Sequence, residues 1–269
     1  MTRAKAPIEP FELGDGDRGA LLLHGLTGSP WDMQRIARAL ARAGWRCHVP
    51  LLRGHDNLDT LERTTWSAWY ADAERAFDRL VTMTSTRIVV GFSMGSLLAL
   101  RLAARRGSEL AGTVAISVPF AFPSWKRRTI TGLARLRSIP LVGRWVGRHD
   151  KRGGIDVRRR RPAERSPGLM AFPYPSLREL VRLQSEVASC LPRVETPLLL
   201  LHGALDHAAA AEDSARVAQR VASADVRRVV MPRSFHLLPR DLDADHACDE
   251  IVAFADRVLA SDPTRRPAS

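Results

Sequence analysis

Short apolar runs alternate with amphipathic stretches along most of the chain, and this alternation constrains the fold more than any other feature. The runs at 20–24, 87–90 and 112–117 are largely apolar, as in strands that are covered on both faces of a sheet. Residues 30–43 and 66–81 instead carry apolar side chains at helical spacing. Strands that alternate with helices form parallel βα units. The sequence therefore predicts an α/β fold with a mostly parallel central sheet flanked by helices.

The same pattern predicts the other elements of the core. They are strands over 11–13, 46–50, 197–202 and 226–231, helices over 94–106, 176–190 and about 211–222, and a last helix that carries Ile251 to Leu259. Residues 51–64 are expected to form a loop. The chain has no internal repeat.

The alternation is interrupted once, between the two halves of the chain. Residues 118–175 are rich in Pro, Gly and Arg and show only short helical pieces. We therefore predict one discontinuous core domain, formed by residues 1–117 and 176–260. An inserted cap is expected at 118–175 and a disordered tail at 261–269.

Basic residues are concentrated in this insertion. The chain has 41 Lys and Arg against 29 Asp and Glu, and only Lys5, Lys126 and Lys151 are lysines. Residues 126–165 hold fourteen of the basic residues and three acidic ones, so nearly all of the excess lies there. No aromatic residue interrupts the run 158–161, which favours a solvated loop over a nucleic-acid site. We expect no nucleic-acid partner, and at most weak contact with anionic membrane surfaces.

The cysteines indicate a reducing compartment. The three cysteines are too few and too scattered for a disulfide framework; they are Cys47, Cys190 and Cys248. The sequence has no CxxC pair, which argues against a structural zinc site. The longest strongly apolar stretch, 197–201, is far shorter than the roughly 20 residues of a membrane-spanning helix. The first ten residues lack the apolar core of a secretory signal. A cytoplasmic location is predicted.

The motif GFSMG marks a candidate nucleophile at Ser93. It matches G-x-S-x-G, ends an apolar strand and opens an apolar helix, which is the setting of a nucleophile elbow. Gly91 and Gly95 fit a tight turn in which neighbouring backbones approach closely. The alternative is a buried serine in a glycine-rich turn.

Two further residues complete a candidate catalytic triad. A serine hydroxyl needs a general base, and the base needs a group that orients it. Asp206 follows the strand at 197–202, and His236 follows the strand at 226–231. Loops at the carboxyl ends of parallel strands are where such sheets place their sites. The order Ser, Asp, His along the chain is the order that a nucleophile elbow of this type requires.

The motif HGLTG, which follows the strand at 20–24, is the candidate oxyanion loop. A tetrahedral intermediate needs two backbone N–H donors. We assign one to Met94, directly after the nucleophile, and the other to Leu26. His24 and Gly25 support the loop. The alternative is a plain strand–helix turn.

No metal or cofactor is expected. The stretch GDGDRG at 14–19 matches a nucleotide-binding spacing, but it precedes a strand instead of opening a helix, and its aspartates would repel phosphate. The sequence contains no HExxH, paired CxxC or EF-hand pattern.

Six motifs together carry a family resemblance. They are HGLTGSP at 24–30, RGH at 53–55, TTWSAWYADAERAF at 64–77, GFSMG at 91–95, LDH at 205–207 and SFH at 234–236. They resemble the bacterial carboxylesterase and monoacylglycerol-lipase-like branch of the α/β-hydrolases, over about 18–117 and 176–260. Two departures are Asp56, where relatives commonly have glycine, and the alanine run after His207, which is expected to loosen the loop of the acid.

The resemblance implies an α/β-hydrolase fold with a small cap inserted after the sixth strand. It also implies a serine esterase that uses Ser93, Asp206 and His236, needs no cofactor, and cleaves short- to medium-chain esters or monoacylglycerols. Other acyl or C–C bond hydrolysis and perhydrolysis are alternatives, and a non-catalytic binding protein is a further one. A monomer or a homodimer is expected.

The insertion is expected to roof the site. It must leave the sheet, and it can lie only over the carboxyl-end loops. Its apolar residues either line an acyl pocket or pack the cap onto the body. They are Ile139, Leu141, Val142, Trp145, Leu169, Met170 and Phe172. The arginines are expected to face solvent, because burying an unpaired charge is costly.

Overall fold

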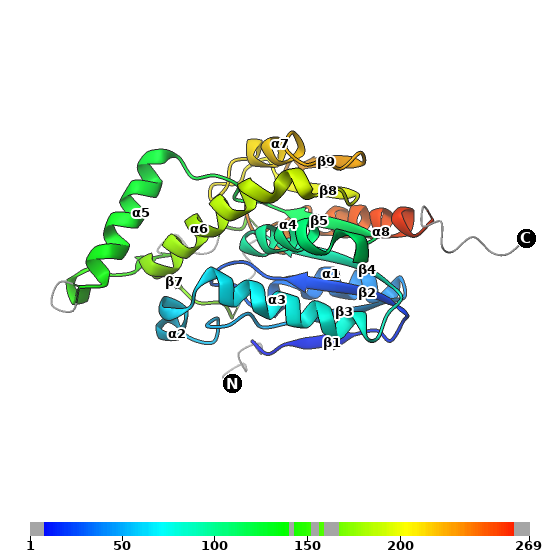
Figure 1. Cartoon of the computed structure of the whole chain (residues 1–269), viewed down its shortest axis with the longest axis horizontal. Coiled ribbons are helices and arrows are strands. Elements are labelled where there is room, and N and C mark those ends of the chain that lie inside the picture. Colours follow the sequence, from blue (N-terminus) through cyan, green and yellow to red (C-terminus); the bar gives the residue numbers. More distant parts are fainter. Residues whose placement is uncertain (1–7, 140–142, 152–155, 159–166, 261–269) are drawn as a thin grey trace, which may run out of the picture.

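A seven-stranded sheet runs through the part of the chain that the structure describes. The computed structural model describes residues 8–139, 143–151, 156–158 and 167–260. The strand order is β1-β3-β2-β4-β5-β8-β9 (Figure 1). The strands are β1 Phe11–Leu13, β2 Arg18–Leu23, β3 Trp45–Val49, β4 Thr86–Phe92, β5 Gly112–Ile116, β8 Leu198–Gly203 and β9 Val226–Met231. Only β1 is antiparallel to its neighbour among these strands, so the mostly parallel sheet is confirmed.

Helices cover both faces of the sheet (Figure 1). One face carries α1 (Pro30–Arg42) and α8 (Ala244–Ala260), and the other carries α3 (Trp66–Val81), α4 (Met94–Arg106) and α6 (Tyr174–Cys190). The remaining helices are α2 Leu58–Arg63, α5 Ser124–Arg137 and α7 Glu212–Ala218. Among the described helices, none is long and apolar enough to cross a membrane.

The apolar runs form strands because both faces of the sheet are buried. Along β2, Ala20 and Leu22 pack with α1 and α8, while Leu21 and Leu23 pack with α3, α4 and α6. All four side chains are fully buried. Side chains alternate between the faces of a strand, so an apolar core on each side requires a continuous apolar sequence.

Side-chain caps begin the helices near the site. The Asp32 carboxylate accepts the Ser29 N–H at 3.0 Å at the start of α1. Asn57 Oδ1 accepts the Thr60 N–H at 2.8 Å and begins α2, in a stretch that the sequence predicts as a loop. That prediction is wrong for 58–63, because a capped turn of only six residues has too little periodicity to be recognised.

The insertion follows β5, the fifth strand of the chain. The resemblance implies a position after the sixth strand, whereas five strands, β1 to β5, precede the insertion in the described chain. Its described part holds α5, which projects from the body beside α6 (Figure 1), and a two-stranded hairpin, β6 (His149–Asp150) and β7 (Ala171–Phe172). A helix as long as α5 contradicts the expectation of short helical pieces only.

The apolar residues named in the insertion have divergent positions. Phe172 lines the cavity described below, and Leu169 packs against the core. Trp145 is 82% exposed and Met170 55%, so for these two residues the predicted burial is wrong. Ile139 is exposed as well. Leu141 and Val142 lie outside the described residues, as do 159–166 and the tail 261–269.

Two arginines of the insertion do not face solvent freely. Arg137 Nε lies 2.6 Å from a Glu62 carboxylate oxygen, and an Arg148 guanidinium nitrogen lies 3.0 Å from the other. Arg148 also pairs with Asp59. These pairs attach the insertion to α2, and they correct the expectation that the arginines of the insertion only point into solvent.

Candidate active site

Ser93 stands on a sharp turn between β4 and α4. A Cβ on Gly91 would lie 2.1 Å from the carbonyl oxygen of Gly95, and a Cβ on Gly95 would lie 2.1 Å from that of Leu23. Only glycine fits at both positions. The G-x-S-x-G spacing therefore follows from the close approach of β2, β4 and α4, and the turn holds Ser93 at the carboxyl edge of the sheet.

Backbone strain is concentrated at this edge. Among the described non-glycine residues, positive φ occurs at Thr27 (61°), Ser93 (53°) and Ser117 (49°). These residues follow β2, β4 and β5, which are neighbours in the sheet. Such residues persist only where their surroundings fix them. Here Thr27 accepts a hydrogen bond from the Leu169 N–H, and Ser117 Oγ donates one to the carbonyl of His236.

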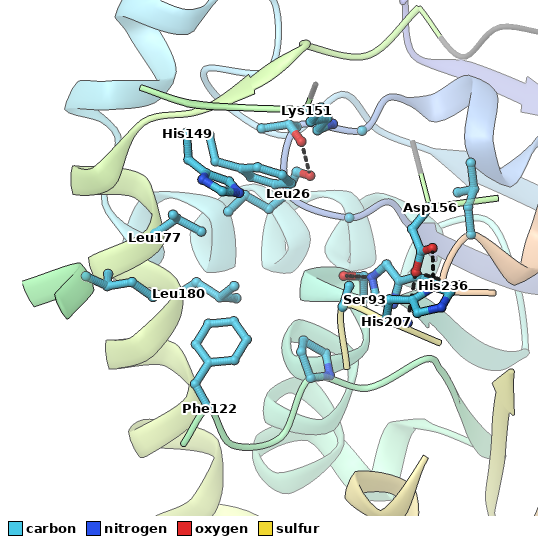
Figure 2. A pocket seen from close by; sticks show the side chains of 18 of the residues that line it. Leu26, Ser93, Phe122, His149, Lys151, Asp156, Leu177, Leu180, His207 and His236 are labelled. Carbon is cyan, nitrogen blue, oxygen red and sulfur yellow. Dashed lines mark hydrogen bonds and ion pairs between the residues drawn. The ribbon is translucent and has the colours of Figure 1, made fainter. Parts of the chain in front are cut away.

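The structure brings Ser93, His236 and Asp206 together. His236 Nε2 lies 2.9 Å from Ser93 Oγ (Figure 2), and His236 Nδ1 lies 2.7 Å from Asp206 Oδ2. Asp206 follows β8, and His236 follows β9, as the sequence predicts. A carboxylate that accepts from Nδ1 leaves Nε2 free to accept a proton from the serine hydroxyl.

The Asp206 carboxylate is buried and fully engaged. Its Oδ1 accepts the N–H groups of Ala208 and Ala209, each at 2.8 Å. Its Oδ2 also lies 3.2 Å from His202 Nε2. Burial alone would raise the pKa of Asp206, but attraction to His236 and the hydrogen bonds hold that pKa below its ordinary value. The alanine run, which was expected to loosen this loop, supplies two of the donors that fix it.

The predicted oxyanion donors, Leu26 and Met94, both belong to segments that adjoin Ser93. Met94 is the first residue of α4, so its N–H has no acceptor within the helix. Leu26 lines the cavity in front of Ser93, and a Cβ on Gly25 would lie 3.1 Å from that of Ser93. Leu26 therefore lies at the cavity and Met94 directly after the nucleophile, and their assignment as oxyanion donors stays a prediction.

Two buried histidines brace the loop that carries Leu26. His24 Nε2 accepts the Leu52 N–H at 3.1 Å, so its proton is on Nδ1, which donates to the Gly25 carbonyl at 3.0 Å. His55 packs edge-on against His24 and lies 3.0 Å from the Leu52 carbonyl. Burial lowers the pKa of His55 to about 4 and that of His24 well below its ordinary value. Both rings are therefore neutral and support the loop by hydrogen bonding and packing. The histidine of the RGH motif, His55, thus has a structural role.

Asp156 of the insertion joins the loops of the acid and the base. Its carboxylate accepts the His207 N–H at 3.0 Å and the His236 N–H at 3.3 Å, and it lies 2.9 Å from His207 Nδ1 (Figure 2). Its carbonyl accepts the Leu237 N–H at 2.9 Å. Sequence reasoning missed this residue, because Asp156 lies 80 positions before His236 in an irregular segment. His202, which the sequence placed only in a strand, was missed as well.

A cavity of about 820 Å³ opens at Ser93 beneath the insertion. Figure 2 shows Phe122, Leu177 and Leu180 on one side of it and His236 on the other. Its apolar lining includes Leu26, Phe122, Ile130, Leu133, Phe172, Leu177 and Leu180. Within the described chain, no group of three or more His, Cys, Asp or Glu side chains is placed to hold a metal ion.

Comparison with known families places the chain. Residues 17–243 match the Hydrolase_4 family, described as Serine aminopeptidase, S33. The chain belongs to this family of α/β-hydrolases. The match spans both halves of the core and the insertion, so the predicted fold class and family are confirmed.

Individual relatives agree with this placement. The chain is 29% identical over 247 residues to a thermostable monoacylglycerol lipase of Bacillus sp. (strain H-257), covering 91% of this chain and 93% of the relative. A solved structure of a metagenome-derived lipolytic enzyme superposes with a TM-score of 0.82 at 24% identity, covering 93% of this chain and 98% of the other. The Paleococcus ferrophilus monoacylglycerol lipase gives a TM-score of 0.71 at 18% identity, with coverage of 93% and 98%. These superpositions establish the fold, and the protein is a carboxylesterase- or lipase-like hydrolase.

Proposed function

We propose that the protein is a serine esterase that hydrolyses short- to medium-chain carboxylic esters or monoacylglycerols through an acyl-enzyme on Ser93. The observation that carries the proposal is the Ser93–His236–Asp206 chain of hydrogen bonds at 2.9 and 2.7 Å, opening into an apolar cavity. The similarity to a monoacylglycerol lipase over nine-tenths of both chains supports ester substrates.

The geometry suits a two-step acyl transfer. His236 Nε2 takes the proton of Ser93 Oγ as this oxygen attacks the ester carbonyl, and the π electrons of the carbonyl move to its oxygen. The tetrahedral intermediate collapses, the C–O bond to the alcohol breaks, and His236 gives its proton to the leaving alcohol. Water then attacks the acyl carbonyl while His236 takes one of its protons. The bond to Ser93 Oγ breaks, His236 returns the proton to this oxygen, and the carboxylic acid leaves. Asp206 holds the imidazole and stabilises its charged form.

The oxyanion is stabilised by two backbone donors. The N–H groups of Leu26 and Met94 flank Ser93, and in a partly buried cavity they need little reorganisation when charge develops. Removing one such donor in comparable enzymes costs about 3 kcal/mol of transition-state stabilisation. The braces at His24 and His55 keep the Leu26 N–H in position.

The acyl chain is assigned to the apolar side of the cavity. Leu177 and Leu180 of α6 and Phe122 and Ile130 of the insertion offer an apolar surface there. Each buried methylene adds at most about 0.8 kcal/mol of binding energy. The proposal therefore includes a preference for medium-length chains over acetyl. A steady fall of kcat/KM from acetyl to dodecanoyl p-nitrophenyl esters would contradict this preference.

The decisive experiment uses a fluorophosphonate probe together with these esters. The native enzyme is expected to be labelled and to hydrolyse them, and Ser93→Ala should lose both labelling and activity with an unchanged circular dichroism spectrum. Labelling of Ser93→Ala at the native rate would refute the assignment. An arm with an aminoacyl p-nitroanilide tests the aminopeptidase activity named in the description of the family.

A further inference from the structure

Both lysines in the described part of the chain line the cavity that contains Ser93. The chain uses arginine for nearly all of its basic residues, and the third lysine, Lys5, lies outside the described residues. Lys126 is on α5, and Lys151 follows β6, so two separate parts of the insertion each direct one ammonium group to the same cavity. This distribution sets the two lysines apart from the arginines around them.

Neither ammonium group is paired with an anionic group of the described residues. Within the described residues, no hydrogen bond or ion pair reaches Lys126 Nζ or Lys151 Nζ. Each Nζ stands over an aromatic ring, that of Lys126 4.3 Å from the centre of Phe122 and that of Lys151 4.7 Å from the centre of Phe172. The cation–π contact compensates only part of the lost hydration. Both lysines therefore have binding capacity that the described part of the chain leaves unused.

The aspartates that line the cavity are engaged elsewhere. Asp32 accepts the Ser29 N–H at the start of α1, and Asp156 accepts N–H groups from His207 and His236. Asp150 is engaged as well. Within the described residues, none of these carboxylates forms an ion pair with either ammonium group, although the Asp32 charge attracts that of Lys151 through space.

Lys151 remains mostly cationic at neutral pH. Burial lowers the pKa of Lys151 to about 8, and the nearby Asp32 carboxylate opposes this shift. Burial also lowers the pKa of Lys126. A partly dehydrated ammonium group gains more from an anion than a fully hydrated one does, because less water must be displaced.

We propose that Lys126 and Lys151 each offer the cavity an anion subsite, so that the enzyme accepts esters whose acyl chain ends in a carboxylate. The proposal rests on the esterase function above and specifies its substrate class. A monovalent carboxylate at the end of an apolar chain fits this arrangement, because each ammonium group is set among apolar side chains such as Phe122 and Phe172. The chain would run from Ser93 along the apolar side of the cavity to either lysine.

The test compares a charged and a neutral ester of equal chain length. The mono-p-nitrophenyl ester of suberic acid carries the carboxylate, and p-nitrophenyl octanoate lacks it. The quantity is the ratio of kcat/KM for suberate to that for octanoate at pH 7. In the double variant Lys126→Met/Lys151→Met this ratio should fall about tenfold, the usual effect of losing one charge-assisted hydrogen bond in a partly buried site. Each single variant should lower it less, because the other lysine still accepts the carboxylate. Lys151→Arg keeps the charge and should retain most of the ratio.

Arg128→Gln is the matched control. It removes one positive charge from the same helix, but Arg128 is exposed and lies outside the cavity lining. Its ratio should equal that of the native enzyme. The anion subsite is refuted if the double lysine variant keeps the native ratio, or if Arg128→Gln lowers it equally. Native hydrolysis of octanoate with no hydrolysis of suberate would also refute the subsite while leaving the esterase function intact, whereas loss of both activities would refute the esterase function.

Discussion

Removing the Asp156 carboxylate should slow catalysis although this side chain makes no bond to Ser93. Asp156→Ala leaves the N–H groups of His207 and His236 without their acceptor. Each lost hydrogen bond to a charged group is worth about 1.5–3 kcal/mol when buried. The Asp156 side chain is 24% exposed, so water replaces part of each bond. We therefore expect the variant to lose about 1–2 kcal/mol of stabilising free energy in total. Because these bonds position His236 beside Ser93, their loss should raise the activation free energy by about this amount and lower kcat by about tenfold.

The assay separates positioning from folding. Steady-state kinetics on p-nitrophenyl octanoate should show a lower kcat with little change in KM, and Asp156→Asn, whose amide oxygen still accepts a hydrogen bond, should recover part of the loss. Asp249→Asn removes an exposed acidic charge on α8 and serves as the control. An Asp156→Ala enzyme with native kcat and a raised KM would show that Asp156 contacts substrate instead of positioning the base.

Three further outcomes are expected. Asp206→Asn should lower kcat by orders of magnitude without unfolding the protein, because the amide can hold His236 in the wrong tautomer; a variant within about twofold of native would move the role to another residue. Gly95→Ala should lower the melting temperature by about 4 °C or more, because its Cβ would lie 2.1 Å from the Leu23 carbonyl oxygen. All three cysteines are buried, and burial raises the pKa of Cys47 to about 12, so Ellman's reagent at pH 8 should react with none of them until denaturant is added.

The core of the fold and the three candidate catalytic residues can be predicted from the sequence because their signals are local. An apolar run bounded by turn residues predicts β4 whatever surrounds it, and the glycines around Ser93 are dictated by contacts within one strand–turn–helix unit. Asp206 and His236 each follow a recognisable strand. Parallel topology then brings the ends of these strands to one edge, so their proximity follows without knowledge of any long-range contact.

The structure of the insertion is much harder to predict from the sequence because long-range contacts determine it. Nothing near Asp156 in the sequence indicates a partner 80 residues away. The ion pair of Arg137 with Glu62 likewise connects α5 of the insertion with α2 of the core, which lie far apart in the sequence. Hydrophobicity alone assigned Trp145 to a packed surface, yet this side chain is exposed. Irregular segments carry no periodicity that separates an inward-facing apolar side chain from an outward-facing one.

The strained backbone at Ser93 sets stability and activity against each other at a single position. A residue held at positive φ costs about 1–3 kcal/mol, against a total folding free energy of about 5–15 kcal/mol for a typical domain. Glycine adopts this conformation without that cost. A screen that rewards only heat resistance would therefore favour replacement of the nucleophile itself, and any programme of thermal improvement must select for turnover in the same step.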